Sequence, residues 1–560
     1  MHQSGPRAIA DAHVETLADL DPQVATELGI RPGSGDLPDY SPDGHAALAA
    51  AHRAALAELT AAESHAPSAT LSPAERRAAR LLRERLTAEL ARHEAGEPLR
   101  DVSNLFSPVH RIRAMLLMMP TGTPEDWAVV ARRLRNVPGA LDGYRRSLAT
   151  GLARGLPAAP RQAATLAEQI GELLAADWYG TFAAGGPVEL RAELAAAADS
   201  AAAALDALRG YLRDSYLPAV AGTPDAVGPD RYLLGARRWT GADLDLADAC
   251  AYGWSEFHRL AREMREAAAE ILPGEPVLAV LRHLDEHGEA IEGVEQVRDW
   301  LQELMDEAIR ELDGTHLDLA EPVRRVESMI APPGTAAAPY YTRPSLDFAR
   351  PGRTWLPTRG ATRFPVWPLV STWYHEGVPG HHLQLAQWVL VQDELSRFQV
   401  SVGSVSATTE GWALYAERLM DELGFFTDPA RRLGHLSGQM ARAVRVIIDI
   451  GMHTGQRIPA GEGFHPGEVW TPGLAAEFFA EHTGMSEGHT ASEIVRYLGI
   501  PGQAISYKLG ERAWLAGRAA ARSAAGGAFD LKSWHMAALS LGSLGLTDLA
   551  DELAALGTGR

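Results

Sequence analysis

The stretch from residue 188 to residue 216 reads VELRAELAAAADSAAAALDALRGYLRDSY. Most of its residues are good helix formers, and its apolar residues recur at spacings of three and four. A second stretch of the same kind, ERRAARLLRERLTAELARHEAG, occupies residues 75–96. Gly and Pro interrupt such runs, as at residues 185–187 and 222–229. The pattern predicts a mainly α fold, built of helices that pack against their neighbours in the chain.

The composition changes between residues 326 and 370. Pro, Gly, aromatic and β-branched residues become frequent there, as in SMIAPPGTAAAPYYTRPSLDFARPGRTWLPT at residues 328–358. We interpret this region as irregular loop with one or two short strands, which form a small β edge along a substrate cleft. Because 560 residues exceed the usual size of a single core, we expect a helical N-terminal lobe over residues 1–325 and a second helical lobe over residues 326–560.

Charge and cysteine content narrow the class of protein. The chain carries 72 acidic and 52 basic residues, a net charge of −20, which argues against a protein that binds nucleic acid by neutralising phosphates. Its sole cysteine, Cys250, excludes an intrachain disulfide and a multi-cysteine zinc site, so His, Asp and Glu would have to hold any metal. The N-terminus lacks the basic start and apolar run of a secretory signal, and no run of about 18 apolar residues occurs. These features predict a cytoplasmic protein that does not enter membranes.

The segment STWYHEGVPGHHLQLAQ at residues 371–387 is chemically the most informative. Helical zinc hydrolases usually place two histidines four residues apart, with a Glu after the first, because positions i and i+4 share one face of a helix. Here the His-Glu pair is His375-Glu376, but position 379 is Pro. The second metal ligand must therefore come from His381 or His382.

Pro379 disfavours an undisturbed helix, because it has no amide hydrogen and its ring clashes with the carbonyl of His375. Gly380 adds conformational freedom. A helix widened by two residues at this point would bring His381 to the usual place of the i+4 ligand. In an undistorted helix His382 would share the face of His375, with its Cα about 10.5 Å along the axis. We favour His381 as the second ligand and keep His382 as the alternative.

Glu376 occupies the position of the general base that acts on a metal-bound water. Catalytic zinc sites typically have three protein ligands, and Glu410, in SATTEGWALYAERL at residues 406–419, is the best candidate for the third. Glu417 lies two turns further on the same face, and we expect it to orient a histidine by contacting the ring nitrogen that does not bind the metal. The plainer alternatives are a solvated His-rich helix end and a Glu stabilised by a helix N-terminus. The apolar runs that flank residues 375–382 favour a buried functional site.

Four blocks together resemble the bacterial family called domain of unknown function 885 (DUF885): HEGVPGHHLQ at 375–384, EGWALYAE at 410–417, RAVRVIIDIGMH at 442–453 and PGQAISYKLG at 501–510. The resemblance covers nearly the whole chain, which suggests one continuous family domain spanning about residues 10–555. The family is similar to the gluzincin metallopeptidases, in the neighbourhood of thimet oligopeptidase and Taq carboxypeptidase. This resemblance implies a large helical body around a long cleft, with one Zn²⁺ per chain held by two His and one Glu.

The same resemblance implies roles for residues outside the ligand set. The phenol of Tyr507 would donate a hydrogen bond to the negatively charged oxygen that forms during hydrolysis, with Gln503 one turn before it. Arg442, Arg445 and His453 are implied as binding residues for a substrate carboxylate or for that oxygen.

We therefore expect metal-assisted hydrolysis of an amide bond in a peptide or an amino-acid conjugate. Two other functions remain open: hydrolysis or elimination at the same metal on a small-molecule conjugate, and a non-catalytic helical binding module. One block departs from the resemblance, because residues 347–349 are Asp-Phe-Ala where we expect Asp-Gly-Ser. If that block lines the cleft, the departure implies a changed substrate specificity or a loss of activity.

Overall fold

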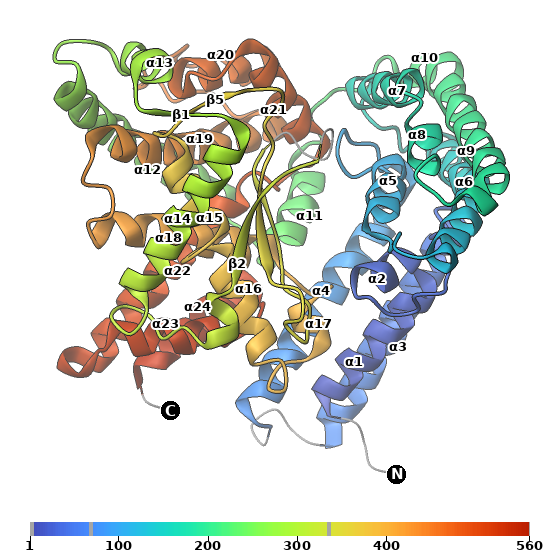
Figure 1. Cartoon of the computed structure of the whole chain (residues 1–560), viewed down its shortest axis with the longest axis horizontal. Coiled ribbons are helices and arrows are strands. Elements are labelled where there is room, and N and C mark those ends of the chain that lie inside the picture. The colour runs from blue at the N-terminus through green and yellow to red at the C-terminus, as the bar shows by residue number, and fades with distance from the viewer. Residues whose placement is uncertain (1–4, 66–70, 333–337, 559–560) are drawn as a thin grey trace. The chain divides into compact units, whose positions relative to one another are not determined.

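The computed structural model describes residues 5–65, 71–332 and 338–558 (Figure 1). Helix makes up 69% of the structure and strand 4%, which confirms the prediction of a mainly α fold. The chain forms two compact units, one of Met1–Leu234 with Ser492–Pro501 and one of Gly235–Ala491 with Gly502–Arg560. The lobe boundary expected near residue 325 falls inside the second unit, as does every residue predicted for the site.

The first unit consists of helices whose starts the sequence marks clearly. Pro stands in the first turn of most of them, where its missing amide hydrogen costs nothing. The helices are α1 (Pro6–Leu20), α2 (Pro22–Glu27), α3 (Pro42–His65), α4 (Pro73–Glu94), α5 (Pro108–Met118), α6 (Pro124–Ala153), α7 (Pro160–Ala175), α8 (Trp178–Ala183), α9 (Arg191–Tyr211) and α10 (Leu217–Val220). Short turns η2 (Glu97–Arg100), η3 (Val188–Leu190) and η4 (Leu212–Tyr216) extend them.

The core of the first unit lies along α6 and α9. Helix α6 buries large apolar side chains at seven-residue intervals, namely Trp127, Leu134, Leu141 and Leu148. Helix α9 packs against it and buries small side chains such as Ala197, Ala198 and Ala201. Large side chains of one helix that meet small side chains of the other allow close packing.

The second unit holds the larger helices and the candidate site. Its helices are α12 (Leu246–Ile271), α13 (Val277–His287), α14 (Val294–Leu312), α15 (Leu369–Glu376), α16 (His381–Leu390), α17 (Arg397–Val400), α18 (Ser406–Glu422), α19 (Pro429–Thr454), α20 (Pro472–Thr483), α22 (Ser506–Ala525), α23 (Leu531–Leu539) and α24 (Leu546–Ala555). Turns η5 (Glu321–Arg324), η6 (Gly526–Ala528) and η7 (Leu556–Thr558) accompany them. Helices α11 (Pro229–Thr240) and α21 (Glu487–Gly499) each contain a point at which the chain passes from one unit to the other, and a third such point lies between Pro501 and Gly502.

Two pairs of long helices organise the second unit. Helix α19 packs along α12, and α18 packs along α22. The second pair is very close, because a Cβ placed on Gly411 of α18 would lie 2.4 Å from the Cα of Gly510 on α22. Only glycine at position 411 allows the two backbones to approach in this way, and this contact fixes α22 against the helix that carries Glu410 and Glu417.

Two small sheets accompany the helices of the second unit (Figure 1). Strand β1 (Ala290–Glu292) pairs antiparallel with β5 (Arg363–Pro365). In the other sheet the strand order is β2 (Val326–Ile330), β4 (Gly352–Leu356) and β3 (Tyr340–Thr342), with β2 parallel and β3 antiparallel to β4. The small β edge is therefore present, but the expectation of one or two strands in residues 326–370 is wrong, since the described part of that region contains four. Residues 333–337 of the expected region lie outside the described residues.

No helix in the described ranges is both long enough and apolar enough to cross a membrane.

Candidate metal centre

The candidate centre begins where helix α15 ends. His375 and Glu376 are the last two residues of α15, and His381 is the first residue of α16. The expected helix with a two-residue widening is wrong, because the chain leaves the helical path over residues 377–380 and then starts a new helix. Pro379 has no amide hydrogen to continue the helical ladder, and the amide of Gly380 instead donates to the carbonyl of Tyr374, 3.0 Å away.

This break has a fixed shape because its backbone is tightly enclosed. A Cβ on Gly380 would lie 2.0 Å from the carbonyl oxygen of His375, so no other residue fits there without a shift of the backbone. From α18, the indole nitrogen of Trp412 donates to the carbonyl oxygens of Pro379 at 2.8 Å and Gly380 at 3.1 Å. The break therefore holds His375 and His381 at a constant separation.

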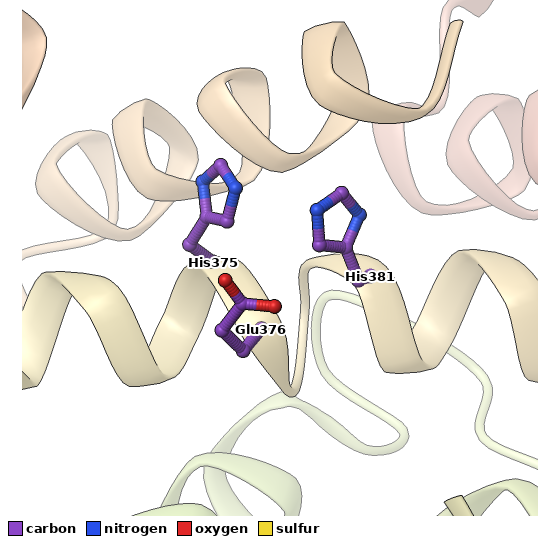
Figure 2. Close-up of side chains that lie close together, drawn as sticks. All are labelled: His375, Glu376 and His381. Atoms are coloured by element: carbon purple, nitrogen blue, oxygen red, sulfur yellow. The ribbon is translucent and has the colours of Figure 1, made fainter. Parts of the chain in front are cut away.

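Figure 2 shows His375, Glu376 and His381 close together. The carboxylates of Glu410 and Glu417 also lie next to the histidines and complete the group. Ligand atoms of His375, Glu376 and His381 all lie within 4.8 Å of one another. Oε2 of Glu410 lies 3.4 Å from Nε2 of His375 and 3.5 Å from Nε2 of His381. Two ligand atoms that are each about 2.0–2.1 Å from a tetrahedral ion lie about 3.3–3.4 Å apart. The donor types, and the spacing of Oε2 of Glu410 from each histidine nitrogen, therefore fit a small tetrahedral cation.

Glu417 supports this group from behind. Its Oε1 lies 2.7 Å from Nδ1 of His375, and its Oε2 accepts a hydrogen bond of 2.7 Å from the hydroxyl of Ser371. Nδ1 of His435, on α19, lies 3.5 Å from the same Oε2. Glu410 and Glu417 can both face the histidines because two helical turns separate them on α18. A carboxylate on the far nitrogen of a metal-binding histidine fixes the orientation of the ring.

The exposure of the side chains in this group decreases from Glu410 to Glu417. The side chain of Glu410 is 20% exposed and that of His381 12%, whereas those of His375 and Glu417 are only 4% and 2% exposed. The group therefore opens to solvent on the side of Glu410, and this is the side from which a substrate could reach it.

Burial and mutual charge perturb the ionisation of the group. Burial by itself would lower the pKa of His375, but its contacts with Glu410 and Glu417 outweigh burial and raise that pKa to about 9. Burial opposes the charges of Glu410 and Glu417, yet the neighbouring histidines hold the pKa of both carboxyls well below the usual range. Burial raises the pKa of Glu376. Glu410 and Glu417 are thus suited to remain ionised, whereas Glu376 is suited to accept a proton.

A family model that matches most of the sequence identifies the family of this chain. DUF885, described as a bacterial protein of unknown function, matches residues 22–553. The chain belongs to DUF885. No curated protein sequence matches this DUF885 chain.

Two solved structures share the fold of this DUF885 protein. The "putative lipoprotein" from Colwellia psychrerythraea is 21% identical in sequence, the match covers 99% of each chain, and the TM-score is 0.83. A "putative lipoprotein of unknown function" from Shewanella oneidensis is 17% identical, with 98% of this chain and 99% of the other covered and a TM-score of 0.74. At these identities the likeness establishes a common fold and nothing about activity.

The alternative ligand His382 faces away from the group in this DUF885 chain. Its Nε2 lies 2.7 Å from the carbonyl oxygen of Val323, and its Nδ1 lies 3.0 Å from the hydroxyl of Tyr341. A carbonyl can only accept, so Nε2 carries the proton and Nδ1 accepts from Tyr341. Burial lowers the pKa of His382 to about 4, so the ring is neutral. Both ring nitrogens are therefore engaged, and the geometry places His381, not His382, beside His375.

The remaining predicted residues lie on α19 and at the start of α22. The guanidinium carbon of Arg445 lies 5.3 Å from the centre of the Tyr507 ring. The carbonyl of Gln503 accepts hydrogen bonds from Ser506 in the turn before α22. His453 is buried, and its Nε2 lies 3.7 Å from Oδ1 of Asp449, one turn earlier on the same helix. Arg445 and Tyr507 thus form a contact between the two helices, whereas His453 makes a contact within α19.

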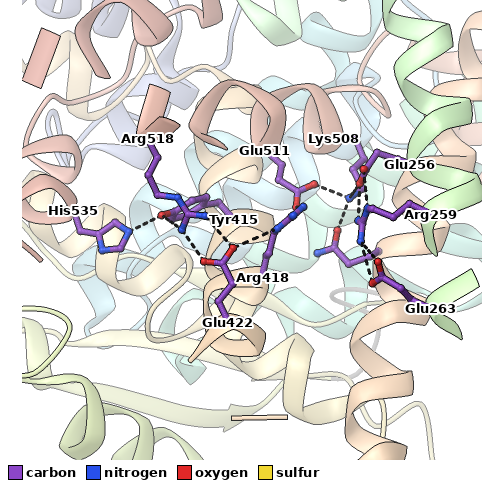
Figure 3. Close-up of polar contacts among 11 residues, drawn as sticks. Glu256, Arg259, Glu263, Tyr415, Arg418, Glu422, Lys508, Glu511, Arg518 and His535 are labelled. Carbon is purple, nitrogen blue, oxygen red and sulfur yellow. Dashed lines mark hydrogen bonds and ion pairs between the residues drawn. The ribbon is translucent and has the colours of Figure 1, made fainter. Parts of the chain in front are cut away.

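A buried polar cluster holds the first turn of α22 (Figure 3). The ammonium of Lys508 donates to Glu511 at 2.6 Å, to Gln439 at 2.6 Å and to Glu256 at 3.0 Å. Burial opposes the charge of Glu256, but hydrogen bonds from Arg259 and Lys508 outweigh it and lower the pKa of Glu256 to about 2. The cluster joins α12, α19 and α22, and it fixes the backbone next to Tyr507.

Sequence reasoning missed several of these contacts. Ser371 stands four residues before His375, so helical spacing alone could have placed its hydroxyl on the face of that histidine. The contribution of His435 to the same carboxylate had no local signal, because it comes from another helix. The same is true of Trp412, whose indole reaches a turn more than 30 residues earlier in the chain.

Proposed function

We propose that this protein is a zinc-dependent hydrolase that cleaves amide bonds in peptides or amino-acid conjugates. The observation that carries the proposal is the placement of one carboxylate oxygen, Oε2 of Glu410, at 3.4 and 3.5 Å from Nε2 of His375 and His381, with Glu376 in the same group. His, His and Glu form a donor set that suits zinc. The expected likeness to gluzincins around a long cleft, and the expected cytoplasmic location, belong to the same hypothesis.

Each side chain of the group has its own role in the proposed hydrolysis. His375, His381 and Glu410 would hold the ion, and Glu417 would keep the ring of His375 in the correct orientation. A zinc ion held there supplies positive charge that polarises the substrate carbonyl and favours the deprotonation of water. Glu376 accepts the proton at its carboxylate, a task that its raised pKa favours, and passes it to the departing amine.

Tyr507 is the proposed donor to the oxygen that becomes negatively charged as the amide bond is attacked. Its ring stacks beside Arg445, and the buried amine of Lys508, the next residue in the chain, fixes the backbone that carries it. A phenol held in this way can remain in place while the substrate reacts, so no reorganisation is needed in the transition state.

Glu376→Gln tests the proposal, because it removes the base and leaves the proposed ligands in place. We expect the variant to bind one zinc per chain and to unfold at nearly the wild-type temperature. Its hydrolysis of short peptides, with free and blocked ends, should be at least about 100-fold slower. Glu394→Gln, a change of the same kind at an exposed position, is the matched control and should hydrolyse at the wild-type rate.

The alternatives give different outcomes in the same experiments. Zinc binding without hydrolysis of any peptide would favour a reaction on a small-molecule conjugate. The lack of bound zinc in protein purified at neutral pH would favour a non-catalytic helical module. Peptide hydrolysis by Glu376→Gln at nearly the wild-type rate would show that the proposed base has another role.

A further inference from the structure

Arg442, on α19, is half-buried, and within the described ranges it makes no ion pair, although its charge interacts at longer range with Glu376 and Glu417. Among the described residues its only hydrogen bond runs from Nη1 to the carbonyl of Gly438 on the same helix, 3.0 Å away. Its Nε is buried and has no hydrogen-bond partner in that part of the chain. An arginine has five N–H donors in a rigid planar fork, so most of the binding capacity of this side chain is not used by the protein itself.

Neighbouring arginines on α19 behave differently. Arg431 lies 3.4 Å from a carboxylate oxygen of Glu289, and Arg432 lies 3.4 Å from a carboxylate oxygen of Asp421. Because a partly buried donor without a hydrogen-bond partner is unfavourable, the unused N–H groups of Arg442 favour a ligand that comes from outside the chain.

The helix places Arg442 beside the metal group. Arg442 follows His435 by seven residues, about two turns, so both side chains leave the same face of α19. His435 lies 3.5 Å from Glu417 on that face. The guanidinium is near enough for its charge to interact with the carboxylates of Glu376 and Glu417. A ligand held by Arg442 would therefore lie close to the proposed base.

We propose that Arg442 binds a free carboxylate of the substrate, and that the substrates are peptides or N-acyl amino acids cleaved next to their carboxyl-terminal residue. A carboxylate can accept two parallel hydrogen bonds from the guanidinium fork. A doubly charged phosphate fits less well, because Glu376, Glu410 and Glu417 surround the centre with negative charge. This inference rests on the proposed function, since it names the substrate class of that same site.

Binding can be measured separately from hydrolysis. In the Glu376→Gln background, the affinities for N-acetyl-alanyl-alanine and for its carboxyl-terminal amide are compared by calorimetry. We expect the free acid to bind about 10- to 100-fold more tightly than the amide, the range for a charge-assisted hydrogen-bonded pair. Adding Arg442→Gln should abolish this preference. Arg442→Lys, which keeps the charge without the fork, should retain only part of it.

Arg432→Gln is the matched control, because it removes an arginine from the same helix whose charge is already paired. It should leave the preference for the free acid unchanged. A preference that survives in Arg442→Gln would come from the bound metal or another cation, and the inference would be wrong. Equal binding of acid and amide by the parent protein, or a loss of affinity for both ligands alike, would also overturn it, since Arg442 would then only balance the charge of the site.

The two proposals can fail separately. If neither ligand is hydrolysed by the wild-type protein but the Arg442-dependent preference is present, the hydrolase proposal fails and the carboxylate site stands. If the wild-type protein hydrolyses acid and amide at equal rates, and binds them equally, the hydrolase proposal stands and the carboxylate site fails.

Discussion

Replacing Glu417 by Gln removes one negative charge and almost no volume from the back of the metal group. The carbonyl oxygen of the glutamine can still accept from Nδ1 of His375, and its amide can donate to the hydroxyl of Ser371. The substitution removes the negative charge of Glu417 from its 2.7 Å contact with His375. A hydrogen bond to a charged group contributes about 1.5–3 kcal/mol and one to a neutral group about 0.5–1.5 kcal/mol. The difference of about 1–1.5 kcal/mol corresponds to zinc binding that is weaker by roughly five- to tenfold.

The assay is a competition between the protein and a chelator of known zinc affinity at neutral pH. Glu422→Gln is the control, because Glu422 lies on the same helix and pairs with Arg518 away from the centre. We expect it to leave the zinc dissociation constant unchanged. A change of less than about twofold in Glu417→Gln would refute the orienting role, and a loss of more than about a thousandfold would identify Glu417 as a direct ligand.

Two further predictions concern His381, His382 and Glu256. His381→Ala should lose zinc, whereas His382→Ala should keep one zinc per chain. His382→Ala should lower the free energy of unfolding by about 1–3 kcal/mol, because it leaves two buried partners unsatisfied. Metal analysis and denaturant titration distinguish these outcomes. Glu256 has a pKa of about 2 in the folded chain against an ordinary 4.5, so its contribution to stability is complete above pH 4.5 and is lost as the pH falls towards 2. The difference in unfolding free energy between the wild type and Glu256→Gln should therefore shrink by about 3 kcal/mol over that range, and equal slopes of the two stability curves would contradict this.

Local sequence patterns predict the helices of this protein well. The run at residues 75–96 corresponds to α4, and the run at 188–216 corresponds to η3, α9 and η4 in succession. In both cases the apolar spacing and the nearby Pro or Gly contain the information that is needed, because helical hydrogen bonds are local. Strands β2 to β5 were underestimated, since each is only three to five residues long and is stabilised by a partner strand elsewhere in the chain.

The candidate site likewise combines features that the local sequence predicts with features that depend on distant residues. The sequence identified Pro379 as the point where a regular helix fails, but it could not give the path of the break, which depends on the indole of Trp412. The choice between His381 and His382 likewise depended on Val323 and Tyr341, which engage His382 from distant parts of the chain. At Phe348 the chain adopts a φ of 55°, the left-handed region that favours the Gly expected there from the family resemblance. The backbone of that loop is thus of the type that glycine favours, although the residue has changed.

Helix α18 carries, within the short block at residues 410–417, several residues that shape the candidate centre. Glu410 faces the histidines, Trp412 holds the break that separates them, and Glu417 engages His375 from behind. Gly411, between the first two, brings this helix against α22, the helix that carries Tyr507. Since a helix is rigid over two turns, these side chains cannot move independently, and their mutual positions are set when α18 packs. The separation of His375 and His381 therefore depends on the same helix that carries Glu410, the proposed third donor, and such coupling suits the strict geometry that a small ion demands.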